Sequence, residues 1–289
     1  VKFHALWKEG KTDAATALAD PAVDAVLIAS STNTHADLIE AAARAGKTIF
    51  CEKPIDLSAK RAQQCVRTVE KLKSKVLIGF NRRFDPSFQA LHAAIEDGKV
   101  GDVEAVLIIS RDPSLPGYDY LKTSGGLFRD MMIHDFDMAR WLLGEEPVEV
   151  IAWASRLADP KLAKLGDWDT AAVTLRTAKG RLCQINNGRR AVYGYDQRIE
   201  VYGSKGTLRA ANRTPTSLEV STEAGVVRDK PYHFFLQRYT EAYRAELDHF
   251  LAVAAGKAKP LVSARDGYLA LKLADAATKS AKTGKPVRV

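Results

Sequence analysis

The segment Gly125–Asp137 contains three ionisable side chains whose spacing suits acid–base chemistry. Asp130, His134 and Asp137 are separated by four and three residues, so on a helix they would share one face. The residues around them are largely apolar, which predicts a buried helix, and buried charge is costly unless it is paired or used. Two interpretations stay open: an Asp–His pair that braces two domains, or a proton-transferring group. No further ligand set accompanies these residues, so no metal site is predicted.

A second candidate is the lysine of Glu52-Lys53-Pro54, which directly follows a predicted strand. The proline restricts the backbone, and a Lys–Pro bond can be cis, which would fix the direction of the ammonium group. The alternative is an ordinary lysine in a surface loop. Together with Asp130 and His134, Lys53 would supply the roles that alcohol oxidation needs. The histidine accepts the hydroxyl proton, the carboxylate orients the histidine, and the ammonium stabilises negative charge on the oxygen.

The elements that would position these residues alternate between strands and helices in the first third of the chain. Short apolar runs predict buried strands, and apolar residues spaced by three and four predict helices. The expected order is strand, helix, strand, helix, strand over residues 25–29, 35–45, 48–51, 58–72 and 75–80. This rhythm predicts a parallel sheet, in which ligands bind outside the carboxyl ends of the strands. Those ends carry residues 30–33, 51–54 and 81–83.

From about residue 83 the pattern changes to short strands joined by turn signals. Strands are predicted over residues 103–110, 148–154, 171–176, 181–186, 198–202, 207–210 and 217–221. The turn signals at residues 177–180 and 203–206 predict hairpins of a mostly antiparallel sheet. Helices are predicted over residues 86–97, 127–143, 235–255 and 265–282. The predicted domains are therefore residues 1–82, with a parallel α/β pattern, and residues 83–289, with an α+β pattern.

The bulk composition disfavours several classes of protein. The chain has 289 residues, of which 46% are hydrophobic, enough for one large or two medium globular domains. No run approaches the ~18 apolar residues of a membrane span. The start lacks the form of a signal peptide, so we expect a cytoplasmic protein with reduced thiols at its three cysteines. The net charge of +8 is scattered along the chain, which argues against nucleic-acid binding.

Several motifs occur in an order that is typical of one family. Glu52-Lys53-Pro54, the polar turn 31–35 and Gly125-Gly126…Asp130-x-x-x-His134-Asp135 resemble motifs of the glucose–fructose oxidoreductase/inositol dehydrogenase/rhizopine catabolism (Gfo/Idh/MocA) family. Segments 50–57, 79–86 and 193–198 are similar to those of its inositol dehydrogenases. The resemblance implies a Rossmann-type parallel domain followed by an α+β domain with a large, mostly antiparallel open sheet. It also implies oxidation of myo-inositol to 2-keto-myo-inositol with NAD, with NADP left open.

The resemblance assigns roles to individual residues. Lys53 matches the catalytic lysine, His134 the base and Asp130 its partner. Substrate contacts are implied for Arg82, Asp112, Asp137 and Tyr195, and cofactor contacts for Ser30, Thr32, Asn33, His35, Glu52 and Lys53. The implied assembly is a homo-oligomer, a dimer or tetramer formed through the large sheet. Its partner is a small-molecule polyol, with neither nucleic acid nor membrane.

The sequence departs from the family at its start. The family's first strand, its Gly-x-Gly-x-x-Gly turn, the following helix and the second strand are absent, so a truncated parallel sheet with exposed apolar edges is expected. Three explanations stay open: a native start that this sequence omits, a naturally short and cofactor-poor protein, or a pseudoenzyme that serves as a polyol-binding or assembly module. A related sugar or polyol dehydrogenase is a further alternative.

Overall fold

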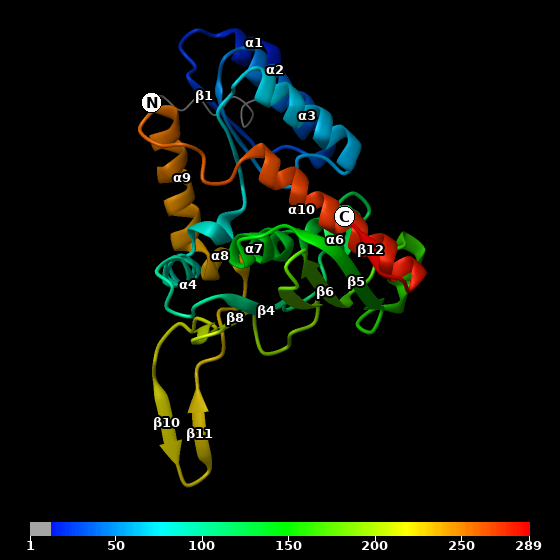
Figure 1. Ribbon diagram of the computed structural model, residues 1–289, viewed down its shortest axis with the longest axis vertical. Helices are drawn as coiled ribbons and strands as arrows, with labels where there is room; N and C mark the ends of the chain where they lie inside the picture. The colour runs from blue at the N-terminus through cyan, green and yellow to red at the C-terminus, as the bar shows by residue number, and fades with distance from the viewer. Residues whose placement is uncertain (1–12) are drawn as a thin grey trace. The chain divides into compact units, whose positions relative to one another are not determined.

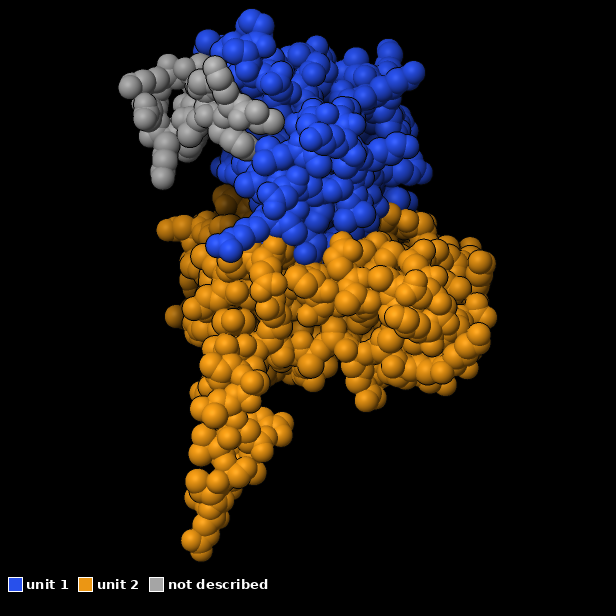
Figure 2. Space-filling view, turned by 90° about the vertical axis from the view of Figure 1, so that its left-hand side faces the viewer, with its two compact units in different colours: residues 1–84, 243–272 blue, residues 85–242, 273–289 orange. Residues whose placement is uncertain are grey.

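A computed structural model of the chain describes residues 13–289. These residues form two compact units that are discontinuous in sequence. The described part of unit 1 consists of residues 13–84 and 243–272, and unit 2 consists of residues 85–242 and 273–289 (Figure 2). The two units are described one at a time below.

Unit 1 contains the predicted parallel sheet. Its strands are β1 (Ala25–Ile28), β2 (Thr48–Cys51) and β3 (Val76–Ile78), paired in the order β1-β2-β3, with α2 (His35–Arg44) and α3 (Ala59–Lys71) as the crossovers (Figure 1). The short helices α1 (Ala14–Ala19) and η1 (Thr32–Thr34) were not predicted. β1 is an edge strand in the part of unit 1 that is described, and Leu27 on it is 52% exposed.

Local sequence explains where these elements begin and end. The Ser58 hydroxyl accepts a hydrogen bond from the backbone N–H of Arg61 and thereby caps the start of α3. Gly46, with φ of +71°, follows the end of α2 in the left-handed conformation that glycine adopts without strain. All residues of β2 and β3 are buried, as expected for continuous apolar runs.

The rest of unit 1 comes from the later part of α9 (Thr240–Ala254) and the early part of α10 (Ala264–Thr283). Phe250 of α9 meets Phe50 of β2 edge to face, with ring centroids 5.7 Å apart. Gly267 of α10 lies so close to Ile55 that a Cβ there would come within 2.8 Å of the isoleucine side chain. The absence of a side chain at residue 267 therefore allows the helix to pack this closely on Ile55.

Unit 2 is built on a seven-stranded sheet with the order β12-β5-β6-β7-β4-β8-β9. Five of its six strand pairs are antiparallel, and only β4 and β7 run parallel, which confirms the mostly antiparallel sheet. The predicted turns close the β6–β7 and β8–β9 hairpins. The strand bounds are β4 Val103–Arg111, β5 Pro147–Ser155, β6 Thr170–Thr177, β7 Leu182–Gly188, β8 Asp196–Gly203, β9 Gly206–Ala210 and β12 Val287–Arg288.

Helices cover one face of this sheet, and α7 packs against β4 and β7. The remaining elements of unit 2 are α4 (Pro86–Glu96), α5 (Tyr118–Leu121), α6 (Gly126–Asp130), α7 (Ile133–Leu143), α8 (Phe235–Arg238) and the 3₁₀ helix η3 (Pro160–Leu165). A separate hairpin of β10 (Glu219–Thr222) and β11 (Gly225–Arg228) extends away from the sheet (Figure 1). All eight of its strand residues are exposed.

Two predicted helices were wrong as continuous elements. The segment 127–143 is split into α6 and α7 by Met131 and Met132, and the segment 235–255 is split into α8 and α9 at Tyr239. At the first break, the carbonyl of Leu127 accepts from the N–H groups of both Met131 and Met132, which takes the backbone out of the regular i→i−4 register. Asp130 therefore ends one helix, whereas His134 and Asp137 lie on the next.

The cysteines Cys51, Cys65 and Cys183 are all free and buried. Burial raises the pKa of the Cys65 thiol to about 12, which makes it a poor nucleophile. Within residues 13–289, no helix has the length and apolarity to cross a membrane.

Candidate functional site

The carboxyl ends of the parallel strands in unit 1 carry the residues predicted to hold a cofactor. Ser30 and Asn33 are exposed after β1, and Thr32 is half-buried beside them. The Ser30 and Thr34 hydroxyls lie 2.6 Å apart, and the Thr34 hydroxyl also donates to the carbonyl of Ser31. This turn presents small polar groups at the strand end where dinucleotides bind in such sheets. The fit supports a dinucleotide site here.

His35 joins two of these strand ends. Its ring is 1% exposed, with Nδ1 2.8 Å from the carbonyl oxygen of Pro54 and Nε2 3.0 Å from that of Ser30. The side chain therefore fixes the turn after β1 to the segment after β2. Its predicted direct contact with a cofactor stays a prediction, and the geometry adds a positioning role.

Lys53 is half-buried, and its backbone is held on both sides. The N–H of Glu52 donates to the carbonyl of Ile28, and the carbonyl of Pro54 binds His35. The Lys53–Pro54 bond is cis, as the sequence had suggested it could be. Arg82, predicted to contact substrate, lies in the 3₁₀ helix η2 (Asn81–Phe84) and is only 3% exposed.

Two acidic side chains of unit 1 interact electrostatically, the half-buried Glu52 next to Lys53 and the buried Glu246 of α9. Burial raises the pKa of Glu52, although the neighbouring Lys53 lowers it in part. Burial and the charge of Glu52 raise the pKa of Glu246 to about 9, and no hydrogen-bond partner of Glu246 Oε1 occurs among the described residues. Glu246 is therefore a neutral carboxylic acid at neutral pH.

Glu246→Gln is expected to remove a pH-dependent loss of stability. Folded Glu246 keeps a proton that the unfolded chain releases above its ordinary pKa of 4.5, so its contribution to stability falls as pH rises from about 5 to 9. The neutral amide cannot release this proton, and we expect it to gain about 1–3 kcal/mol relative to wild type at pH 8. Thermal unfolding between pH 5 and 9 measures the slope. Asp248→Asn, at an exposed position of the same helix, is the control, and equal slopes in all three proteins would contradict the prediction.

Unit 2 carries the other predicted catalytic residues. Asp130, at the end of α6, is half-buried. Its Oδ1 accepts a 2.6 Å hydrogen bond from the Tyr120 hydroxyl, and its Oδ2 lies 3.4 Å from Arg189 Nη2. His134 is the second residue of α7 and is also half-buried. Two hydrogen-bond donors thus hold Asp130 in place. His134 lies four residues later in the chain, after the break at Met131 and Met132 that separates α6 from α7.

The predicted substrate residues of unit 2 differ in burial. Asp112 is half-buried directly after β4, and its N–H donates to the carbonyl of Gly188. Asp137 is 1% exposed, with Oδ1 3.7 Å from Arg140 Nη1, which favours a role in bracing α7. Tyr195 is 7% exposed, and its ring meets that of Tyr239 edge to face. Polyol contacts for these residues stay predictions.

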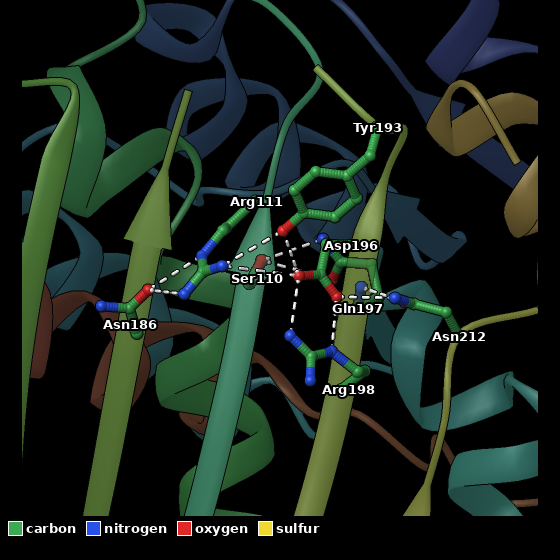
Figure 3. A network of polar contacts seen from close by, with 8 residues as sticks. All are labelled: Ser110, Arg111, Asn186, Tyr193, Asp196, Gln197, Arg198 and Asn212. Atoms are coloured by element: carbon green, nitrogen blue, oxygen red, sulfur yellow. Dashed lines mark hydrogen bonds and ion pairs between the residues drawn. The ribbon is translucent and has the colours of Figure 1, made fainter. Parts of the chain in front are cut away.

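A polar network holds the strand ends beside Tyr195 (Figure 3). At its centre lies the buried carboxylate of Asp196, which accepts from the Tyr193 hydroxyl at 2.6 Å, from Arg198 at 2.7 and 3.0 Å, and from Asn212 at 2.7 Å. Burial raises the pKa of Asp196, but these donors outweigh it and the pKa is lowered. The carboxylate is therefore ionised and fixes the start of β8.

The sequence assigned no role to Arg189, Tyr120, Asp167 or Asp196, all of which hold parts of this arrangement. Their contacts are tertiary, and hydrophobic periodicity carries no information about which polar side chains meet, so it could not have found them. Among residues 13–289, no cluster of histidine, cysteine, aspartate and glutamate has a metal-binding arrangement.

Comparison with known protein families identifies the family of the chain. Residues 6–80 match the pattern described as "Oxidoreductase family, NAD-binding Rossmann fold", and residues 92–289 match "Oxidoreductase family, C-terminal alpha/beta domain", the two parts of Gfo/Idh/MocA proteins. The chain belongs to the Gfo/Idh/MocA oxidoreductase family. The predicted fold class is thereby confirmed, as is NAD as the cofactor of the first domain.

Three members of the family illustrate the similarity. The chain is 56% identical to the inositol 2-dehydrogenase of Rhizobium meliloti over 93% of this chain and 81% of the relative. A crystal structure of a myo-inositol dehydrogenase from Corynebacterium glutamicum matches with a TM-score of 0.89 and 43% identity, covering 94% and 81% of the two chains. The scyllo-inositol dehydrogenase of Lactobacillus casei, solved with NAD(H) and scyllo-inositol, matches with a TM-score of 0.88 and 30% identity, covering 96% and 83%.

Proposed function

We propose that the protein oxidises myo-inositol to 2-keto-myo-inositol with NAD. The observation that carries this proposal is the 56% identity to an inositol 2-dehydrogenase along 93% of the chain. The ionisable groups that polyol oxidation needs support it: a lysine at a strand end of unit 1, and an aspartate and a histidine around the α6–α7 break of unit 2.

In the proposed mechanism, each of the three residues has a separate role in removing the proton or stabilising the charge that develops during oxidation. NAD, when bound, would supply the acceptor for the hydride that leaves the carbinol carbon. His134 takes the hydroxyl proton, and Asp130 orients the imidazole and stabilises its charged form. Lys53 donates a hydrogen bond to the substrate oxygen and stabilises the negative charge that develops on it. The polyol's other hydroxyls would be bound by Arg82, Asp112, Asp137 and Tyr195.

For the cofactor, the proposed contacts lie at the strand ends of unit 1. They comprise Ser30, Thr32, Asn33, His35, Glu52 and Lys53. Exposed hydroxyl and amide groups after β1 suit hydrogen bonds to a dinucleotide, whereas the buried His35 ring binds the backbone carbonyls of Ser30 and Pro54. We propose domain limits of 1–82 and 83–289.

The proposed setting is the cytoplasm, in a pathway of inositol catabolism, with the protein acting as a homo-oligomer, most simply a tetramer. The outward face of the large sheet supports this assembly. It exposes large apolar side chains on three of its strands, with Trp153 on β5 64%, Tyr202 on β8 52% and Leu107 on β4 37% exposed. Such a patch marks a protein interface. Light scattering should give a mass that is a multiple of the protomer's.

The activity is tested by NADH formation on protein whose intact mass has been measured. Myo-inositol should be oxidised with a higher kcat/KM than scyllo-inositol or glucose. Preference for glucose would favour a related sugar dehydrogenase of the family. Polyol binding by calorimetry, without NAD binding or turnover, would favour a binding module and sink the proposal.

A further inference from the structure

Arg189 is a buried arginine that follows β7 in unit 2. Its side chain is 0% exposed, yet it carries a charge. Nη1 lies 3.1 Å from Asp167 Oδ2, and Nη2 lies 3.4 Å from Asp130 Oδ2. Since a buried charge persists only when it is well paired, Arg189 and the two carboxylates form one unit. The guanidinium therefore couples Asp130 to a second acid.

Asp167 is the anchor of this unit. Its Oδ1 accepts from the backbone N–H of Leu127 at 2.7 Å and of Trp168 at 2.8 Å. The first of these bonds satisfies a free N–H in the first turn of α6. Gly126 makes the approach possible, since it has φ of +82° and a Cβ there would lie 2.7 Å from the same oxygen. The Gly125-Gly126 motif thus admits a carboxylate that fixes the start of the helix.

The far end of α6 is fixed by the same guanidinium. Asp130 closes that helix, and Arg189 reaches it with Nη2, whereas Nη1 contacts Asp167. Tyr120 donates to the other oxygen of Asp130. Burial and the Asp130 charge raise the pKa of Tyr120, so its phenol stays a neutral donor. Both oxygens of Asp130 are therefore engaged by donors from distant segments.

We infer that Arg189 is a positioning residue for the proposed oxidation, which holds Asp130 in the orientation needed to serve His134. This inference rests on the proposed function for its catalytic consequence. Arg189 also supplies positive charge to a cluster of two acids. The other ionisable groups at the cluster are Tyr120, Asp112 and Arg156. The charge of Asp112 helps to raise the pKa of Tyr120, and Arg156 Nε donates to the carbonyl of Asp167. Removing the positive charge of Arg189 would make the electrostatic environment of His134 more negative, and this would favour the protonated form of its imidazole.

Three variants test the inference. Arg189→Met removes the charge, and Arg189→Lys keeps the charge but cannot span two carboxylates as a planar fork does. Arg190→Met is the matched control, because the adjacent Arg190 is exposed and binds only the carbonyl of Leu157 in the described structure. For Arg189→Met we expect kcat to fall about 10- to 100-fold and KM for NAD to stay unchanged. The pH midpoint of kcat should rise by about one unit.

Arg189→Lys should keep the wild-type pH midpoint and lose kcat several-fold. If Arg189→Met does not fold, the Arg189→Lys variant tests whether Arg189 positions Asp130. Wild-type kcat and pH midpoint in every folded Arg189 variant would overturn the inference. An NMR titration of the His134 ring gives a readout that needs no turnover. If wild-type protein oxidises no inositol, the proposed function fails, yet an upward shift of that titration in Arg189→Met would still support the positioning role, and an unchanged titration would refute it.

Discussion

His134→Ala is expected to lower kcat for inositol oxidation by about 10²–10⁴-fold, the usual contribution of a general base. The alcohol proton must leave as the hydride departs, and imidazole is the side chain that accepts protons near neutral pH. His134 lies in the first turn of α7 and is half-buried, so alanine leaves no large cavity in the core. Steady-state NADH formation across a pH series measures the loss, and the acid-side fall in activity should vanish.

Two further variants separate base catalysis from folding. His233→Ala removes an exposed histidine of the same unit and should leave kcat unchanged. His134→Gln keeps a hydrogen-bonding side chain but cannot accept a proton at neutral pH, so it should be nearly as impaired as alanine. Near-normal turnover in either His134 variant would mean that another group removes the proton.

The parallel part of the fold could be predicted because its signals are local. The strand at residues 48–51 was predicted with its exact limits, since a threonine and three apolar residues between a glycine turn and a lysine–proline turn leave little choice. Ser58 was correctly predicted to open α3, because a serine before an amphipathic run is a reliable cap. Hairpins in the second sheet followed from glycine turns in the same way.

The break between α6 and α7 could not be predicted from periodicity. Apolar residues continue across Met131 and Met132, so the pattern favours one helix. In the structure the helix is interrupted there, because the carbonyl of Leu127 accepts hydrogen bonds from the N–H groups of both methionines. The support of Asp130 was equally hidden. Arg189 is 59 residues from Asp130 and 22 from Asp167, and only the folded sheet brings the three side chains together.

Motifs singled out the candidate residues but did not reveal their contacts. The polar turn after β1 was correctly located at a strand end, but the His35 ring binds two backbone carbonyls, a use that no motif reveals. Likewise, the acid at position 52 was predicted as a cofactor contact, and its electrostatic interaction with the buried Glu246 of α9 depends on packing. Residue identity therefore indicated the chemistry, and tertiary contacts determined how each group is held.

Lys53→Met is expected to lower kcat by about 10²–10³-fold, the range seen when a donor to developing negative charge is removed. Methionine keeps much of the volume of the lysine stem and loses the ammonium group. Because the neighbouring backbone is fixed by Ile28 and His35, the loop should keep its path, and thermal stability should change little. NADH formation with myo-inositol measures the effect on kcat and KM.

The Lys53 prediction can be separated from a loss of binding. Lys60→Met, at an exposed position of α3, is the control and should match wild type. Arg in place of Lys53 should restore little activity, because a planar guanidinium cannot take the position of a compact ammonium. Slower hydride transfer should also enlarge the isotope effect with inositol deuterated at C2. A Lys53→Met enzyme with raised KM, normal kcat and no larger isotope effect would show that the lysine only binds substrate, since uniform binding alters KM without altering the chemical step.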